Sequence, residues 1–201
     1  MYRRQFLALV AAMPLMSTSA RADELDVEAI LNDPEAPERG NPKGDVTIVA
    51  FTDYNCPFCK KSAPDLKREV SEDGNIRLVY KDWPILGEAS VFGAQMALGA
   101  KYQDAYEKVH SALMGIRGRV TKERMLEVVK AAGIDMARLQ TDLDANSDKI
   151  SGLLKRNLAE ADSLGLEGTP VYLVGPFKAS TLDYDGFRKI VTQARARQSG
   201  K

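Results

Sequence analysis

The sequence predicts an α/β protein in which two separate parts of the chain build one sheet and a helical block is inserted between them. Three patterns lead to this prediction: strand, helix, strand over residues 46–80, helical periodicity over 88–164, and hairpin then helix over 171–197. A parallel strand–helix–strand unit and a hairpin–helix unit can share a sheet. The 201 residues, 44% of them hydrophobic, suffice for a core of that size.

The first 22 residues have the three parts of a secretory signal. A pair of arginines precedes an apolar run over residues 6–16, and "ARA" at 20–22 is a small-residue cleavage site. The run is too short to cross the ~30 Å hydrocarbon core of a bilayer. We therefore expect a signal peptide at 1–22, a mature start at Asp23 and a periplasmic protein. The arginine pair leaves both the general secretory route and the twin-arginine route open.

The charge balance argues against one class of partner. Lys plus Arg and Asp plus Glu both count 28, and the predicted signal peptide carries three basic residues and no acidic one. The mature chain is therefore mildly acidic, whereas surfaces that bind nucleic acid are basic. We expect no nucleic-acid partner.

The first half of the chain predicts a lead-in, a strand and a helix. Residues 23–45 hold three prolines and two glycines, which favours an extended lead-in with at most a short helical turn at 27–31. "VTIVAF" at 46–51 is typical of a strand buried on both faces. Residues 57–70 follow as a helix, because Pro57 at its first position loses no helical hydrogen bond.

The middle of the chain changes from strand to helix. "IRLVY" at 76–80 predicts a second strand, which Trp83 and Pro84 end. Over residues 88–164 the apolar residues recur at spacings of three and four, so several helices are expected. Within this block, Gly133 and Asp135 are the expected stop of one helix and N-cap of the next.

The last part predicts a hairpin and a helix. "GTPVYLVGPFKAS", from residue 168, gives a strand at 171–174, a Gly-Pro turn and a weaker strand at 177–179. A final helix is expected over residues 184–197. Gly165 marks the end of the helical block.

Both cysteines of the chain lie in one Cys-x-x-Cys, Cys56 and Cys59, where the first strand meets its helix. So small a loop would remove little unfolded-state entropy, which makes a structural staple a poor explanation. On the first turn of a helix the pair is close enough for a disulfide that opens and closes. Cys56 at the N-cap is the expected nucleophile, because free N–H groups and the helix dipole favour a thiolate there. Cys59, one turn further in, is the expected resolving thiol.

Three segments in order resemble the DsbA-like thiol–disulfide oxidoreductases: "FTDYNCPFCK", "KDWPILGEAS" and "GTPVYLV". The resemblance covers about residues 44–197 and implies a thioredoxin fold with an inserted helical domain. Residues 46–84 and 165–201 would form the thioredoxin domain, and 85–164 the insertion. In this family the proline of the Thr-Pro pair is cis and faces the active site. That catalytic role would fall on Pro170, with Thr169 before it.

The predicted substrate contacts are Pro57, Phe58 and Thr169. Unfolded clients offer hydrophobic segments near their thiols, so the surface that receives them should be apolar. Tyr54, Phe58, Trp83 and Tyr172 are candidates for its lining, and core packing stays equally open for each of them. Asp53, Lys60 and Lys61 adjoin the cysteines, but capping or solvated positions explain these three as well.

Phe58 stands where strongly oxidising members of the family carry histidine. An imidazolium beside the thiolate is therefore absent, and its share of thiolate stabilisation is absent with it. We expect the pKa of Cys56 to lie below the ~8.5 of a free thiol and above the ~3.5 of the most oxidising members.

The resemblance implies a protein that forms disulfides in reduced or unfolded clients through mixed disulfides and is regenerated by a redox partner. A reductase or isomerase of the same fold, or a non-catalytic binding protein, are the alternatives. Isomerases of this fold generally need an added oligomerisation segment, which the lead-in does not offer, so a monomeric oxidase is expected. No cofactor is expected. No metal is expected either, because two thiolates are only half of a zinc site and the single histidine, His110, lies in the helical block as a structural or exposed residue.

Overall fold

The structure is a computed structural model that describes residues 26–118 and 120–200, so the predicted signal peptide at 1–22 lies outside the described residues. Strands and helices follow the predicted order, which confirms the fold class. In chain order the elements are α1 Val27–Asn32, β1 Glu38–Gly40, β2 Val46–Thr52, α2 Pro57–Asp73, β3 Ile76–Asp82, α3 Glu88–Ala100, the 3-10 turn Lys101–Gln103, α4 Tyr106–Met114, α5 Lys122–Ala131, α6 Met136–Ala145, α7 Ser147–Ser163, β4 Val171–Val174, β5 Phe177–Ala179 and α8 Tyr184–Ser199.

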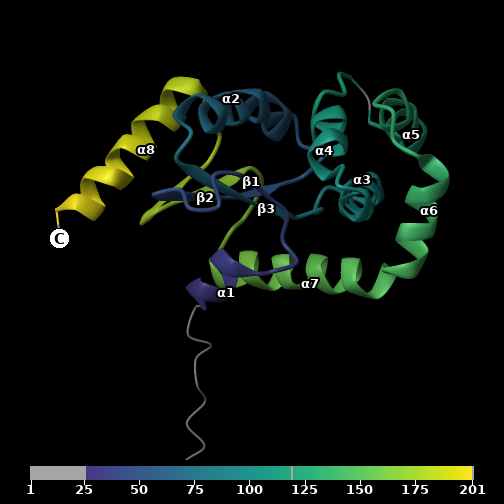
Figure 1. The fold of residues 1–201 in the computed structure, drawn as a ribbon, viewed down its shortest axis with the longest axis horizontal. Coiled ribbons are helices and arrows are strands. Elements are labelled where there is room, and N and C mark those ends of the chain that lie inside the picture. Colours follow the sequence, from purple (N-terminus) through teal and green to yellow (C-terminus); the bar gives the residue numbers. More distant parts are fainter. Residues whose placement is uncertain (1–25, 119, 201) are drawn as a thin grey trace, which may run out of the picture.

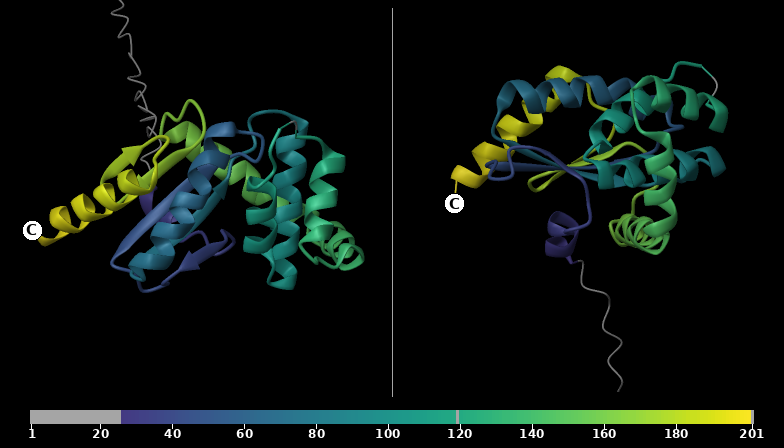
Figure 2. Two further views of the ribbon diagram at one scale, coloured as in Figure 1. Left: turned by 90° about the horizontal axis from the view of Figure 1, so that it is seen from above. Right: turned by 45° about the vertical axis from the view of Figure 1, so that its right-hand side comes forward.

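The sheet has the strand order β1-β3-β2-β4-β5, so the two ends of the chain do share it. β2 and β3 are parallel, with Val46 opposite Ile76 and Thr52 opposite Asp82. β4 is antiparallel to β2. In Figure 1, α2 and α8 cover one face of the sheet and α1 and α7 lie on the other. Figure 2 shows the remaining helices of the block standing beside the sheet.

The lead-in is more structured than the sequence predicts. Besides α1, it contains the edge strand β1, which pairs antiparallel with β3 so that Glu38 lies opposite Val79 and Gly40 opposite Arg77. All three residues of β1 are exposed. A three-residue strand with two charged side chains has no apolar alternation to reveal it, and those charges protect the sheet edge from further pairing.

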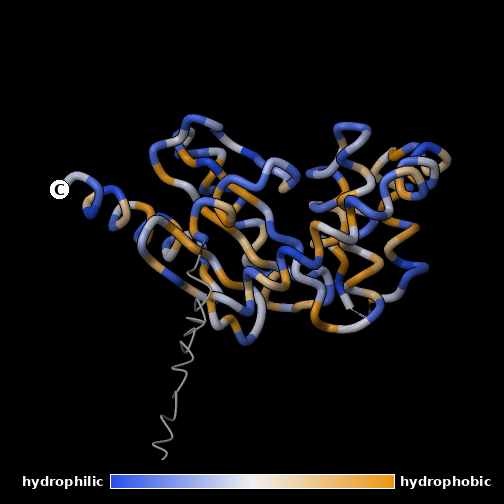
Figure 3. Tube along the Cα trace, turned by 90° about the horizontal axis from the view of Figure 1, so that it is seen from below, coloured by the Kyte–Doolittle hydropathy of each residue, from blue (hydrophilic) through white to orange (hydrophobic). Residues whose placement is uncertain are grey.

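The two central strands are buried on both faces, as their apolar runs indicate. Ile48 and Ala50 enter the core beneath α2, whereas Val49 and Phe51 enter a second core with Ala161 of α7. In Figure 3 hydrophilic residues concentrate in the outer loops and towards the C-terminus. Alternate residues of one strand therefore hold helices against both faces.

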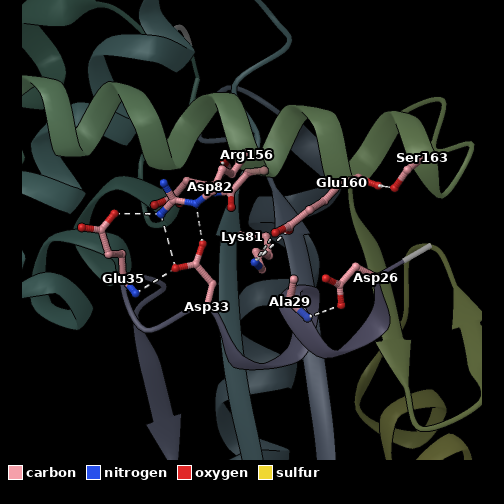
Figure 4. A network of polar contacts seen from close by, with 10 residues as sticks. Asp26, Ala29, Asp33, Glu35, Lys81, Asp82, Arg156, Glu160 and Ser163 are labelled. Atoms are coloured by element: carbon pink, nitrogen blue, oxygen red, sulfur yellow. Dashed lines mark hydrogen bonds and ion pairs between the residues drawn. The ribbon is translucent and has the colours of Figure 1, made fainter. Parts of the chain in front are cut away.

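A polar network fixes α7 against the sheet (Figure 4). Lys81 of β3 is wholly buried, and its Nζ donates to Glu160 of α7 at 2.9 Å. Arg156 of α7 donates to Asp33 at 2.9 and 3.3 Å and to Glu35 at 2.7 Å, and both acceptors lie in the segment that follows α1. Burial raises the pKa of Glu160, and the neighbouring Lys81 ammonium opposes that shift. α7, although it ends the predicted insertion, thus packs directly on the sheet.

The helical block ends and restarts where the sequence indicates. Gly133 has a φ of +74° and Gly165 a φ of +60°, the left-handed backbone that favours glycine after a helix. Asp135 caps α6 by accepting from the backbone N–H of Ala137 and of Arg138, each at 3.0 Å. Across residues 26–118 and 120–200, no helix has both the length and the apolarity that a membrane crossing requires.

Candidate active site

The two cysteines lie at the start of α2, directly after β2. Cys56 is the N-cap, and its sulfur accepts a hydrogen bond from the backbone N–H of Cys59 at 3.4 Å. Pro57 takes the first helical position, as predicted. Both thiols are free; Cys56 is 3% exposed and Cys59 is wholly buried. An attacking group can therefore reach one sulfur and not the other.

The pKa of Cys56 is lowered to about 5. The hydrogen bond with the Cys59 thiol is the largest cause, and burial opposes it. The Thr169 side chain and the backbone N–H groups of Cys59 and Phe58 lower the pKa further. The value lies inside the range that the sequence predicts for a helix N-terminus without a neighbouring imidazolium.

Cys59 has the opposite character. Burial raises the pKa of its thiol, and the proximity of Cys56 raises it further. The backbone N–H of Asp53 donates to its sulfur at 3.5 Å. Cys59 is thus a protonated thiol at neutral pH, whereas Cys56 is a thiolate.

The Thr-Pro pair lies against Cys56. The Thr169–Pro170 peptide bond is cis, and the carbonyl oxygen of Thr169 is 3.2 Å from the Cys56 sulfur, 113 positions away in the chain. The protonated thiol donates to this carbonyl, a contact that favours the thiol over the thiolate. Pro170 is buried and Thr169 is partly exposed. The structure therefore brings together Cys56, Cys59 and the Thr-Pro pair, as the resemblance implies.

The comparisons with known proteins agree with this geometry. A profile of the thioredoxin family matches residues 32–193. The chain is similar to the solved structure of a thioredoxin-like oxidoreductase from Silicibacter pomeroyi DSS-3, with 38% identity and a TM-score of 0.79 over 85% of this chain and 98% of that one. It is also similar to the thiol-disulfide exchange protein alpha-DsbA2 from Wolbachia pipientis, with 31% identity and a TM-score of 0.78 over 83% and 90% of the two chains. The chain belongs to the DsbA-like thioredoxin superfamily.

The curated relatives of this DsbA-like chain include two kinds of protein. The probable disulfide bond formation protein D of Bacillus anthracis is 26% identical over 166 residues, which are 76% of this chain and 75% of that protein. The Na(+)/H(+) antiporter NhaA 1 of Salinispora arenicola is 24% identical over 138 residues, 68% of this chain but 21% of the antiporter. The chain thus spans between a fifth and about a quarter of the length of the curated antiporters that it matches.

Three of the four aromatic residues considered for the substrate surface belong to the core of this DsbA-like protein. Tyr54 is 1% exposed, Trp83 3% and Tyr172 not at all. Trp83 packs edge-on against Phe51 in the second core, and Tyr172 packs edge-on against Phe187 of α8. The lining hypothesis is wrong for these three, and the core alternative is confirmed. Phe58, between the cysteines, is 58% exposed.

The charged neighbours of the cysteines have structural contacts. The Asp53 carboxylate is buried and accepts from three backbone N–H groups: Asn55 at 2.6 Å, Ile85 at 2.8 Å and Leu86 at 3.0 Å. The Lys60 ammonium donates to the carbonyl of Ile116 at 3.0 Å, and burial lowers its pKa. Lys61 is exposed. The capping alternative therefore describes Asp53 well.

A buried polar cluster beneath the active-site turn was not predicted. The Tyr106 hydroxyl donates to Asp82, 3.1 Å from each carboxylate oxygen, and the Tyr54 hydroxyl lies 3.0 Å from His110 Nδ1. Burial raises the pKa of Asp82 to about 7 and lowers that of His110 to about 4. His110 is therefore a neutral core residue. In the described part of the chain, no three His, Cys, Asp or Glu side chains gather in a way that could hold a metal ion.

Proposed function

We propose that this protein is an exported thiol–disulfide oxidoreductase that forms disulfides in client proteins through Cys56 and Cys59. The observation that carries the proposal is the contrast between the two thiols: Cys56 at a helix N-terminus with a pKa of about 5, and Cys59 buried with a raised pKa. A stable thiolate in the reduced form makes the corresponding disulfide oxidising. Cys56 also leaves readily, because a thiol of low pKa is a good leaving group.

The reaction proceeds in two exchanges. A client thiolate attacks the sulfur of Cys56 in the oxidised protein, the Cys56–Cys59 bond breaks, and Cys59 takes up a proton. A second client thiolate then attacks the client sulfur of the mixed disulfide, and Cys56 leaves as a thiolate. The client loses two electrons and gains a disulfide, while the protein keeps two reduced cysteines. Attack by Cys59 on the mixed disulfide is the reverse of the first exchange and releases the client.

The remaining site residues have supporting roles in this proposal. Pro170 and Thr169 face Cys56 from the opposite loop and present backbone to a bound client. Pro57 and Phe58, both exposed, are the client contacts on the side of α2. The partners are reduced or unfolded polypeptides and a redox protein that restores the disulfide; the protein acts as a monomer without a cofactor.

Equilibration with glutathione tests the direction of the reaction. An oxidase should have a reduction potential clearly less negative than the ~−270 mV of thioredoxin, and we expect a value above about −200 mV. A potential near that of thioredoxin would favour the reductase alternative. Refolding of a scrambled-disulfide substrate, with light scattering for the oligomeric state, separates a monomeric oxidase from an isomerase.

The proposed periplasmic location rests on the predicted signal peptide. A periplasmic thioredoxin-like protein from Salmonella enterica serovar Typhimurium, 28% identical to this chain with a TM-score of 0.73, supports it. N-terminal sequencing of the exported protein should give Asp23. A soluble cytoplasmic protein that retains Met1 would overturn the location but not the chemistry.

A further inference from the structure

The Asp53 carboxylate joins two segments that flank the reactive cysteines. One is the turn between β2 and α2, which holds Asn55; the other is the segment Pro84–Gly87 between β3 and α3. One carboxylate oxygen accepts from Asn55, and the other accepts from Ile85 at 2.8 Å and Leu86 at 3.0 Å. The Asn55 side-chain amide adds a bond to the carbonyl of Leu86 at 3.4 Å. The two segments are therefore held together by side chains of the active-site turn.

Asp53 also contacts both cysteines through its backbone. Its carbonyl oxygen accepts from the N–H of Cys56 at 3.1 Å, and its own N–H donates to the sulfur of Cys59. One residue thus sets the position of Ile85 and Leu86 relative to the two sulfur atoms. A shift of the Asp53 side chain would move this segment without removing either thiol.

The segment that Asp53 holds is apolar and exposed. Ile85 is 38% exposed, Leu86 45% and Phe58 58%. Of the seven large hydrophobic side chains that are exposed in the described part of the chain, Ile85 and Leu86 lie on the segment that Asp53 holds, while Phe58 lies on the first turn of α2 and Val91 on the first turn of α3. Exposed apolar side chains that gather at one place mark an interaction surface.

The backbone of this segment is constrained as well. Pro84 fixes the direction in which the chain leaves β3, because its ring locks φ. Gly87 has a φ of +104°, a conformation that a residue with a side chain adopts only with strain. Ile85 and Leu86 are therefore presented from a short loop whose two ends and middle are all restrained.

We propose that Ile85 and Leu86 form an apolar wall that determines specificity by packing against an apolar client segment while the client cysteine reacts at Cys56. Asp53 is the positioning residue for this wall. The inference rests on the proposed function and names the client chemistry: a polypeptide with large apolar residues beside its cysteine. Asn55, the residue before Cys56, donates to the carbonyl of Leu86, so a chain packed on Ile85 and Leu86 lies beside the active-site turn. A client with polar residues at those positions gains no burial.

The test compares two dithiol peptides that differ only in having leucine or serine on both sides of the reactive cysteine. The oxidised mature protein catalyses their oxidation with glutathione disulfide as the regenerating oxidant, and kcat/KM is measured for each. The wild type should prefer the leucine peptide about tenfold, as expected when apolar surface is partly buried. The double variant Ile85→Ser with Leu86→Ser should lower this ratio to near one. Leu158→Ser is the matched control, because Leu158 is also 45% exposed but lies on α7, across the sheet.

Asp53→Asn tests the positioning role with little change of shape. The amide keeps one acceptor oxygen but turns an NH₂ group toward backbone N–H donors, so at least one contact is lost. The ratio should fall through a higher KM for the leucine peptide, and the amides of Ile85 and Leu86 should exchange hydrogen faster. Asn55→Ala removes the hydrogen bond from the partly exposed Asn55 side chain to the carbonyl of Leu86, so it should lower the preference for the leucine peptide by less than Asp53→Asn does. This variant takes the place of Asp53→Asn if Asp53→Asn does not fold.

The outcomes separate the two proposals. If the wild type oxidises neither peptide, the proposed function fails. If the wild type oxidises both peptides equally well, or if Leu158→Ser lowers the ratio as much as the double variant does, the wall is refuted while the oxidoreductase stands. If the Asp53 and Asn55 variants lower kcat equally for both peptides and leave the ratio unchanged, Asp53 has no positioning role for the wall.

Discussion

The backbone N–H of Cys59 donates a hydrogen bond to the sulfur of Cys56, with 3.4 Å between nitrogen and sulfur. Because α2 begins between the two residues, this N–H is one of the first four of the helix, which have no partner within it. The Cys56 sulfur is the acceptor for this N–H, and a thiolate accepts a stronger hydrogen bond there than a thiol does. The same helical turn places Cys59 in the core. A single local feature thus accounts for the different chemistry of two identical side chains.

Cys59→Ser is expected to accumulate mixed disulfides with client proteins. In this variant the Cys56 thiolate can still attack a disulfide of a client, which forms the mixed disulfide and releases the other client thiolate, whereas breaking the mixed disulfide by intramolecular attack needs the second thiol. Cys56→Ser should trap almost nothing, since Cys59 is wholly buried. Non-reducing gels of cells that express each variant measure the trapping, and the double variant is the control. Equal trapping by the two single variants would reverse the assignment of nucleophile and resolving thiol.

The reduced protein should become more stable as the pH rises from about 5 to 8. The pKa of Cys56 is about 5 in the folded protein and has its ordinary value, ~8.5, in the unfolded chain. Within that window the unfolded chain binds more protons at Cys56, so the free energy of unfolding rises with pH by up to about 1.4 kcal/mol per unit. The contribution is lost as the pH falls through 5. Cys59 is protonated in both states up to about pH 8 and adds no slope.

Urea unfolding of the reduced protein and of Cys56→Ser at four pH values measures this effect. The difference in unfolding free energy between the two proteins should grow from pH 5 to pH 8. The subtraction removes the titration of His110, which both proteins share. A constant difference would contradict a stabilised Cys56 thiolate.

Asp82→Asn should stabilise the protein at pH 8. Asp82 is 1% exposed, and burial raises its pKa to about 7, from an ordinary value near 3.9. A raised carboxyl pKa gives a contribution that is present below about pH 4 and lost as the pH rises through 7, so the wild type should lose up to a few kcal/mol over this range. Asparagine still offers an oxygen to Tyr106 and does not titrate.

Thermal melts at pH 4 and pH 8 check this expectation. The variant should melt above the wild type at pH 8, and the gap should narrow at pH 4. Asp162→Asn, at an exposed position of α7, is the matched control and should show no such gap. A variant that is destabilised equally at both pH values would mean that hydrogen-bond geometry, and not charge, sets the role of Asp82.

The sequence predicts those elements whose buried residues form a regular apolar pattern along the chain. β2 and β3 are apolar along most of their length because helices cover both faces, and the helical block shows its period because one side of each helix enters the core. β1 escapes prediction since it is short, charged and defined only by its pairing with β3. Tyr54, Trp83 and Tyr172 show a related limit: residue type predicts that an aromatic side chain is apolar, not whether it faces a client or the core.

The candidate site was predictable in its local part and not in its tertiary part. Cys56, Pro57 and Cys59 follow from helix capping, which acts within four residues. The contacts of Asp53 with Ile85 and Leu86 depend instead on the register that places Thr52 beside Asp82, so that the loops after β2 and β3 begin together. Two parallel strands that end at the same edge would have indicated that these loops meet. They would not have indicated which carboxylate oxygen binds which N–H.

Phe58→His should lower the pKa of Cys56 and make the disulfide more oxidising. Phe58 is 58% exposed between the cysteines, and its backbone N–H already helps to lower the pKa of Cys56 to about 5. A histidine side chain in its place adds a donor and, below its own pKa, a positive charge beside the thiolate. Each further stabilisation of the reduced form raises the potential, by about 30 mV for every 1.4 kcal/mol in this two-electron couple. Absorbance of the thiolate against pH measures the pKa of Cys56, and equilibration with glutathione measures the reduction potential, in both proteins.

Phe58→Leu is the control, because it changes the shape of the side chain without adding charge and should leave both quantities close to those of the wild type. If histidine changed neither quantity, the side chain between the cysteines would not control the redox potential, and the hydrogen bonds from the Cys59 thiol, the Thr169 side chain and the helix N-terminus would have to account for the whole shift of the Cys56 pKa.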